Sequence, residues 1–197
     1  MKGRKKQKNL VFSIEGVHGV GKTTVLDLLR QKYANDANWY FFNERKQQRD
    51  FISFGSKDPQ MAFRSEVYFI QQMTNRNKEI SRKVANVDGK ICVMDRSALS
   101  VLVYSAALNM LQNDFQQLLD MYESVEWRED QLIYLTATPE TLLKRIRHRG
   151  SLDAQRLEWN EEDLAYVNRL VEKYEQYFRR YNFDKRMTRI ETTNLTA

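Results

Sequence analysis

Several residue types are scarce in this sequence, and each shortage excludes a class of protein. Cys92 is the only cysteine among 197 residues, so no internal disulfide can form and a reducing, intracellular setting fits. One cysteine and two histidines are too few for a structural zinc site. No apolar run is long enough to span a bilayer, and two prolines and seven glycines argue against long disordered linkers. We therefore expect a soluble, cytoplasmic protein without a membrane partner.

Acidic residues are outnumbered by basic ones, which gives a formal net charge of +6 at pH 7. A basic balance is typical of proteins that bind nucleic acid, acidic lipid or a phosphate-bearing substrate. Part of the excess lies in residues 1–8, which we interpret as a basic flexible tail. A nuclear address or a polyanion contact is the alternative, and nucleic acid is not the partner that we favour. Residues 9–197 have the size of a single domain.

Short apolar runs typical of strands alternate along the chain with longer amphipathic stretches typical of helices. The predicted strands are residues 10–14, 39–42, 90–94, 132–135 and 188–192. The predicted helices are residues 23–33, 60–87, 97–111, 114–123, 139–149 and 160–181. Because most of the predicted strands are apolar rather than alternating, they indicate a parallel sheet covered on both faces. The sequence thus predicts an α/β fold, a three-layer α/β/α domain with a five-stranded parallel sheet.

Residues 16–23 match the phosphate-loop pattern G-x-x-x-x-G-K-[ST] at every fixed position. Glycines let the backbone N–H groups turn toward phosphate oxygens, and the following helix directs its positive end at the same anion. Lys22 supplies a cation for the β- and γ-phosphates, and the Thr23 hydroxyl is a hard oxygen ligand suited to Mg²⁺. The sequence therefore predicts a site for ATP and Mg²⁺. Its residues are Gly16, His18, Gly19, Val20, Gly21, Lys22, Thr23 and Thr24.

Two carboxylates follow predicted strands, at the edge of a parallel sheet where ligands gather. Asp95, at the end of the third strand, is suited to hold a Mg²⁺-bound water or the acceptor, and the adjacent Arg96 is suited to bind phosphate. A helix cap at Ser97 with a structural ion pair is the alternative. Glu44, after the second strand, is suited to accept the proton of an attacking hydroxyl. An exposed loop charge is the alternative there.

Arginines gather near the end of the fifth predicted helix. Arg145 and Arg149 lie four residues apart and so share a helical face. Two guanidinium groups aimed together can stabilise the charge on a transferring phosphoryl group. A solvated basic face is the alternative.

The phosphate loop, residues 95–97 and the arginine-rich residues 145–150 together resemble the deoxynucleoside kinases and their relatives, the thymidylate kinases. The similarity covers residues 10–185. It implies a P-loop kinase fold with ATP and Mg²⁺ as cofactors and a helical lid at about residues 145–160. It also implies a homodimer, because such relatives are commonly dimers.

The same resemblance implies roles for individual residues. Glu44 matches the carboxylate that acts as base toward the 5′-hydroxyl of the acceptor, and Arg96 matches an arginine near the reacting oxygens. Arg145 and Arg149 match lid arginines that close over the ATP phosphates, and Phe63 is similar to the aromatic residue that stacks on the acceptor base. The predicted catalytic residues are Glu44, Arg96, Lys22, Arg145 and Arg149. The predicted substrate-binding residues are Glu44, Phe63, Arg64, Arg76, Asp95 and Arg96, and the predicted metal-binding residues are Thr23 and Asp95.

Four positions depart from the patterns of these families. Arg45 stands where deoxynucleoside kinases usually have proline, and Arg64 where they have a base-reading glutamine. Ser97 stands where thymidylate kinases usually have tyrosine. His18 replaces the loop acid of thymidylate kinases and is similar to the loop histidine of herpesvirus-type thymidine kinases. The base preference and the class of acceptor therefore stay open.

Three functional hypotheses fit the sequence. We favour the ATP-dependent phosphorylation of a deoxynucleoside 5′-hydroxyl in nucleotide salvage. The alternative is a thymidylate-type nucleoside monophosphate kinase, whose charged acceptor needs a cationic clamp. Candidates for that clamp are Arg45, Arg49, Arg64 and Arg76. A non-catalytic nucleotide-binding protein is the third hypothesis, and Glu44→Gln separates the first two.

Overall fold

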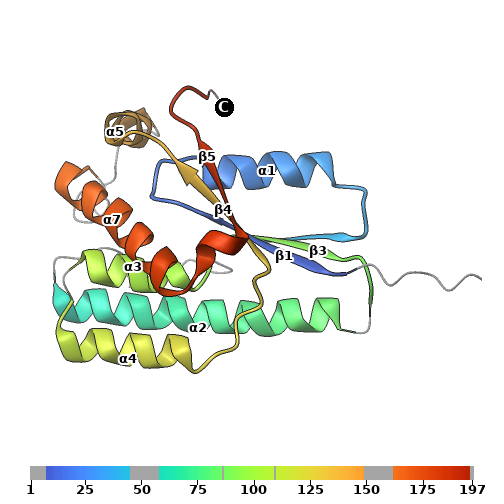
Figure 1. The fold of residues 1–197 in the computed structure, drawn as a ribbon, viewed down its shortest axis with the longest axis horizontal. Helices are drawn as coiled ribbons and strands as arrows, with labels where there is room; N and C mark the ends of the chain where they lie inside the picture. The colour runs from blue at the N-terminus through green and yellow to red at the C-terminus, as the bar shows by residue number, and fades with distance from the viewer. Residues whose placement is uncertain (1–7, 45–57, 86, 109, 149–161, 196–197) are drawn as a thin grey trace, which may run out of the picture.

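Strands and helices alternate along the chain (Figure 1). The computed structural model describes residues 8–44, 58–85, 87–108, 110–148 and 162–195. The strands are β1 (Leu10–Glu15), β2 (Trp39–Phe42), β3 (Ile91–Asp95), β4 (Gln131–Thr136) and β5 (Met187–Glu191). The helices are α1 (Lys22–Lys32), α2 (Pro59–Val84), α3 (Leu99–Ala107), α4 (Gln112–Glu123), α5 (Pro139–His148) and α7 (Leu164–Arg180), and a short 3-10 helix spans Phe183–Arg186.

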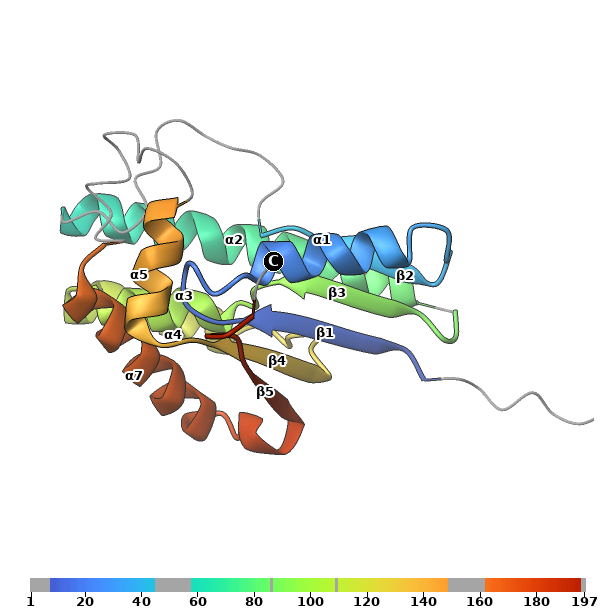
Figure 2. The same ribbon diagram turned by 90° about the horizontal axis from the view of Figure 1, so that it is seen from above.

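The five strands form one sheet in the order β2-β3-β1-β4-β5, and every neighbouring pair is parallel. Helix α1 lies on one face of the sheet, and α2, α3, α4 and α7 lie on the other (Figures 1 and 2). This arrangement confirms the predicted three-layer α/β/α fold with a five-stranded parallel sheet. It also brings the carboxyl ends of β1, β2 and β3 to one edge, where the phosphate loop begins.

Several helix boundaries differ from those predicted, and hydrogen bonds explain the starts of α7 and α3. Helix α7 starts after Asp163, whose side chain accepts a hydrogen bond from the first turn; the predicted cap, Asn160, lies outside the described residues. Helix α3 begins at Leu99 rather than at Ser97. The backbone N–H of Ser97 donates to the Glu15 carboxylate, which holds this residue in the preceding turn.

The core lies mainly between the sheet and the helices of its second face. Helix α3 packs against α2, α4 and α7, and nearly all its side chains are buried. Tyr134 of β4 packs against Tyr174 and Phe178 of α7, which fixes α7 close to β4. In the part of the chain that the structure describes, no helix combines the length and the apolar character needed to cross a membrane.

Candidate active site

The phosphate loop connects β1 to α1 and depends on glycine at its first position. Gly16 has a φ of 139°, and a Cβ atom built on it would lie 2.5 Å from the carbonyl oxygen of Leu135 in β4. A side chain there would collide with the neighbouring strand. Gly21, with a φ of 102°, directly precedes α1 and sets the turn into that helix.

The Lys22 side chain is buried behind this loop, with 6% of its surface exposed. Its Nζ atom donates to the carbonyl oxygens of Gly16 at 2.9 Å and Val17 at 3.0 Å. Burial, with a smaller contribution from Arg96, lowers the pKa of Lys22 to about 7 against the opposing effect of nearby carboxylates that include Asp95. Lys22 therefore shares its surroundings with the residues that follow β3.

Asp95 and Thr23 meet where β3 ends and α1 begins. The Thr23 hydroxyl donates to Oδ2 of Asp95 at 3.0 Å, whereas Oδ1 is buried and accepts no hydrogen bond from the described residues. Hard oxygen atoms of this kind are the ligands that Mg²⁺ prefers. Within the described ranges no group of three or more acidic, histidine or cysteine side chains could hold a metal alone. The pair thus fits an ion that takes its other ligands from water and phosphate.

Arg96 links the end of β2 to the phosphate loop. Its Nε atom lies 3.0 Å from Oε1 of Glu44, and its Nη2 atom donates to the Tyr104 hydroxyl at 2.8 Å. Nη1 donates to the carbonyl oxygen of Gly16 at 3.3 Å. Burial opposes the charge of this guanidinium, but Tyr104, Glu44 and other nearby groups outweigh burial and raise the pKa of Arg96 well above its ordinary value. Arg96 therefore stays charged beside the loop.

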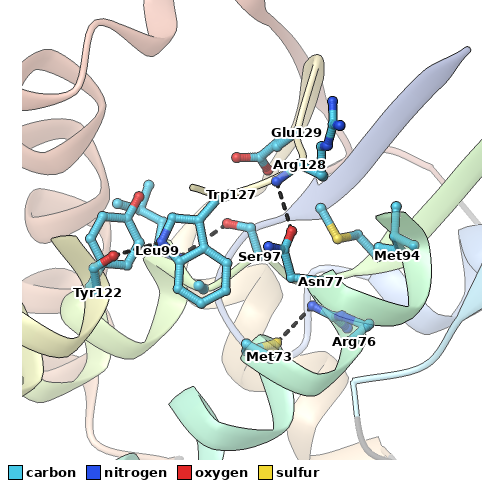
Figure 3. A pocket seen from close by; sticks show the side chains of 12 residues that line it. Met73, Arg76, Asn77, Met94, Ser97, Leu99, Tyr122, Trp127, Arg128 and Glu129 are labelled. Carbon is cyan, nitrogen blue, oxygen red and sulfur yellow. Dashed lines mark hydrogen bonds between the residues drawn. The ribbon is translucent and has the colours of Figure 1, made fainter. Parts of the chain in front are cut away.

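Arg76 of α2 uses its guanidinium to hold backbone, and the residue also lines the hollow of about 450 Å³ beside Glu44. Nη1 donates to the carbonyl oxygens of Asn43 at 3.1 Å and Asp95 at 2.8 Å, and Nη2 donates to that of Arg96. Figure 3 shows Arg76 beside a cavity of about 20 Å³ that Ser97 also lines. This cavity has room for about one water molecule and is too small for a nucleoside. Arg76 thus braces the ends of β2 and β3.

Arg145 of α5 contacts the chain that follows β5. Its guanidinium donates to the hydroxyl of Thr192 at 3.0 Å and to the carbonyl oxygen of Leu195 at 2.9 Å. The Thr192 hydroxyl has its nearest acceptor in the carbonyl oxygen of Thr136, at 2.9 Å, and also lies 3.3 Å from the carbonyl oxygen of Val20 in the phosphate loop. Arg145 therefore reaches the loop through Thr192. Arg149 and most of the predicted lid lie outside the described residues.

Four further predicted residues, Phe63, Arg64, His18 and Thr24, lie on α2, in the phosphate loop and on α1. Phe63 is half-buried against the core and Arg64 is exposed on α2; neither lines the hollow of about 450 Å³ that lies beside Glu44 between β2 and α2. The His18 ring lies over Tyr166 at a centroid distance of 6.1 Å. Thr24 is exposed at the start of α1.

Three residues of the cluster were not among the predicted ones: Glu15, Tyr104 and Tyr174. Glu15 could have been predicted from the sequence, because a charged residue at the end of an otherwise apolar strand has to be paired when it is buried. The two tyrosines could not have been predicted as site residues, since their spacing on α3 and α7 is that of core residues.

Comparison with known proteins places the chain among nucleotide kinases. A family model described as thymidylate kinase matches residues 14–196. The thymidylate kinase of Clostridium novyi is 24% identical over 93% of this chain and 95% of its own length. That of Anoxybacillus flavithermus is 26% identical over 93% of this chain and 89% of its own. The structure of deoxyadenosine kinase from M. mycoides with bound dATP has a TM-score of 0.71 at 20% identity, covers 92% of this chain and 91% of that chain, and shares the fold.

Proposed function

This chain belongs to the thymidylate kinase family, and from that premise we propose that it transfers the γ-phosphoryl group of ATP to the 5′-hydroxyl of a deoxynucleoside. Family membership supplies the broader statement, that the chain is a nucleotide kinase. The choice of acceptor comes from the site. The observation that carries it is the pairing of Glu44 with Arg96.

The pairing supports an uncharged acceptor because it balances the charge at the end of β2. Arg96 lies 3.0 Å from Glu44, so its positive charge already has a counterion. Arg76, another buried cation nearby, donates to backbone carbonyl oxygens. A phosphate monoester carries about −1.5 to −2 charges at neutral pH and would stand beside the Glu44 carboxylate. A nucleoside hydroxyl brings no such repulsion and offers a hydrogen that the carboxylate can accept.

In this mechanism the chain positions the reacting groups and balances their charge. Glu44 accepts a hydrogen bond from the 5′-hydroxyl and takes its proton as the new bond to the γ-phosphorus forms. The bond from that phosphorus to the β–γ bridging oxygen breaks, which gives a nucleoside 5′-monophosphate and ADP. Lys22 and Arg96 neutralise charge on the phosphoryl oxygens. Thr23 and Asp95 would hold Mg²⁺, which neutralises charge on the β- and γ-phosphates when it is bound.

A thymidylate-type kinase is the second candidate, and the family model and the curated relatives favour it. Its acceptor is charged and needs cations more than a general base. Arg64, which is exposed on α2, and Arg45 and Arg49, which lie outside the described residues, would supply the clamp.

The test is to incubate the protein with ATP–Mg²⁺ and a panel of deoxynucleosides and deoxynucleoside monophosphates, and to identify each product by mass. We expect nucleoside monophosphates as products. Glu44→Gln should lower kcat by about 100-fold to 10,000-fold because the general base is lost. The matched control is Glu172→Gln, an exposed change on α7 that should leave kcat unaltered.

Two results would overturn this assignment of the acceptor. Phosphorylation of monophosphates alone, with less than a tenfold effect of Glu44→Gln, would establish the thymidylate-type reaction. Tight binding of ATP without phosphorylation of any acceptor in the panel would support the non-catalytic alternative.

A further inference from the structure

The backbone of Arg96 adopts a conformation that other residues have to maintain. Its φ is 60°, and among the described residues only Asn182 shares a positive φ without being glycine. A residue other than glycine is strained in this region, so surrounding contacts must hold it there. The N–H of Arg96 donates to the carbonyl oxygen of Ile14 at 3.0 Å, and its own carbonyl accepts from Arg76.

Glu15 holds the next residue of the same turn. This carboxylate is fully buried at the end of β1, directly before the phosphate loop. Its Oε1 atom accepts from the backbone N–H of Ser97 and, at 2.7 Å, from the Ser97 hydroxyl. Its Oε2 atom accepts from the Tyr174 hydroxyl at 2.9 Å. Both oxygens are therefore paired, as a buried carboxylate requires.

The Tyr174 hydroxyl has a fixed direction because of Glu15. A phenol has one hydrogen to donate, and here its nearest acceptor is Oε2 of Glu15. The oxygen is then left with lone pairs, and Nη1 of Arg96 donates to it at 3.2 Å. The Tyr174 ring is fully buried and packs against Tyr134 and Phe178, at centroid distances of 5.3 and 5.5 Å. The ring therefore cannot swing away.

We propose that Tyr174 is a positioning residue, whose hydroxyl, oriented by Glu15, holds the guanidinium of Arg96 in the place where its Nε atom faces Glu44. The contacts occupy different parts of one guanidinium: Tyr174 on Nη1, Tyr104 on Nη2 and Glu44 at Nε. Without the Tyr174 hydroxyl, Nη1 keeps only the longer bond to Gly16. The group could then turn about the remaining contacts and carry its charge away from the reacting oxygens. The kinetic test of this positioning role rests on the proposed phosphoryl transfer, whereas the geometry that supports the role does not.

The change that isolates this role is Tyr174→Phe, which removes the hydroxyl and leaves the ring in its packing. We expect kcat to fall by about 10-fold to 100-fold, since a displacement of about 1 Å in a positioned group can cost that much. The KM for ATP should change by less than about threefold, because the phosphate loop is untouched. The control is Tyr177→Phe on the same helix, where the buried ring stacks on Tyr181. The kcat of this control variant should be unaltered.

A double-mutant cycle separates positioning from general damage. If Tyr174 acts through Arg96, adding Tyr174→Phe to Arg96→Lys should lower kcat by less than about threefold. Losses that multiply in the double variant, or a kcat for Tyr174→Phe equal to that for Tyr177→Phe, would overturn the proposal.

A second measurement needs no acceptor and so separates this proposal from the proposed function. In ¹⁵N NMR spectra of the protein alone, we expect slow rotation and slow hydrogen exchange of the Arg96 guanidinium, and faster rates in Tyr174→Phe. Unchanged rates would refute the positioning role. A failure to phosphorylate any acceptor would refute the proposed function. The NMR rates would still decide whether Tyr174 positions Arg96.

Discussion

The burial of the Lys22 ammonium should make ATP binding depend on pH. Burial lowers the pKa of Lys22 to about 7 in the free protein, and Arg96 adds to the effect while Asp95, Glu44 and Glu15 oppose it. Bound phosphates favour the charged form, so the pKa of Lys22 in the complex lies above its value in the free protein. ATP binding therefore takes up a proton, and the affinity falls as the pH rises above the pKa of the free protein.

The size of the effect follows from the fraction of Lys22 that carries a proton. With a pKa of about 7, about 90% of this side chain is charged near pH 6 and about 10% near pH 8. Raising the pH across that window should weaken ATP binding by about tenfold, which corresponds to about 1.4 kcal/mol.

Isothermal titration calorimetry in two buffers of different ionisation enthalpy measures this proton uptake directly. Near pH 7.5 the wild-type protein should take up roughly three quarters of a proton when ATP binds. Lys22→Arg is the control, because a guanidinium stays charged throughout while the ionisation of ATP is the same for both proteins. If both proteins take up the same number of protons, the burial of Lys22 does not cause the pH dependence and the reasoning is wrong.

Three further predictions concern the loop, a half-buried carboxyl group and the core. Gly16→Ala should abolish ATP binding in a calorimetric titration, since its Cβ would lie 2.5 Å from the Leu135 carbonyl oxygen; near-normal affinity would contradict this. Burial raises the pKa of Glu129 to about 7, so stability should fall as the pH rises from about 5 to about 7, and Glu129→Gln should flatten that fall in urea unfolding. Equal slopes would exclude Glu129 as the cause. Phe178→Ala, at a fully buried site, should lower the free energy of unfolding by about 3–5 kcal/mol, and a loss below about 1 kcal/mol would contradict the packing described.

The fold could be predicted where the signal is local. Apolar runs bounded by polar residues located β1 to β4, because burial leaves little alternation along these strands, whereas β5 is largely polar and exposed. The order β2-β3-β1-β4-β5 could not be derived in this way, since it depends on contacts between strands far apart in the chain. The predicted start of α3 at Ser97 is wrong because Ser97 binds Glu15 instead. That bond joins residues 82 positions apart, so the local sequence gives no sign of it.

In the candidate site, too, local motifs could be predicted from the sequence and contacts between distant residues could not. The phosphate loop is a continuous motif, so Lys22 and Thr23 could be found from the sequence, and Thr23 does contact Asp95 across 72 positions. The contact between Arg145 and Thr192 could not be foreseen, because it depends on how β5 packs beside β4. Tyr174 was indistinguishable from the apolar stripe of its helix, and only its hydroxyl, within reach of Glu15, sets it apart.

Two buried arginines behind the phosphate loop illustrate how partners decide what a cation can do. Arg76 donates to neutral carbonyl oxygens, such as those of Asn43 and Asp95, and burial lowers its pKa to about 10 despite nearby carboxylates. Arg96 has the Glu44 carboxylate and tyrosine hydroxyls beside it, and its pKa is raised well above the ordinary value. A guanidinium that holds three backbone carbonyls has little freedom to follow a moving phosphoryl group. In the proposed transfer to a deoxynucleoside, Glu44 would become neutral as it takes the proton, and the charge of Arg96 would then be balanced by the developing phosphate charge. In that mechanism Arg96 would stay in the place that Tyr174 and Tyr104 give it, and the proton transfer alone would free its charge to stabilise the phosphoryl group.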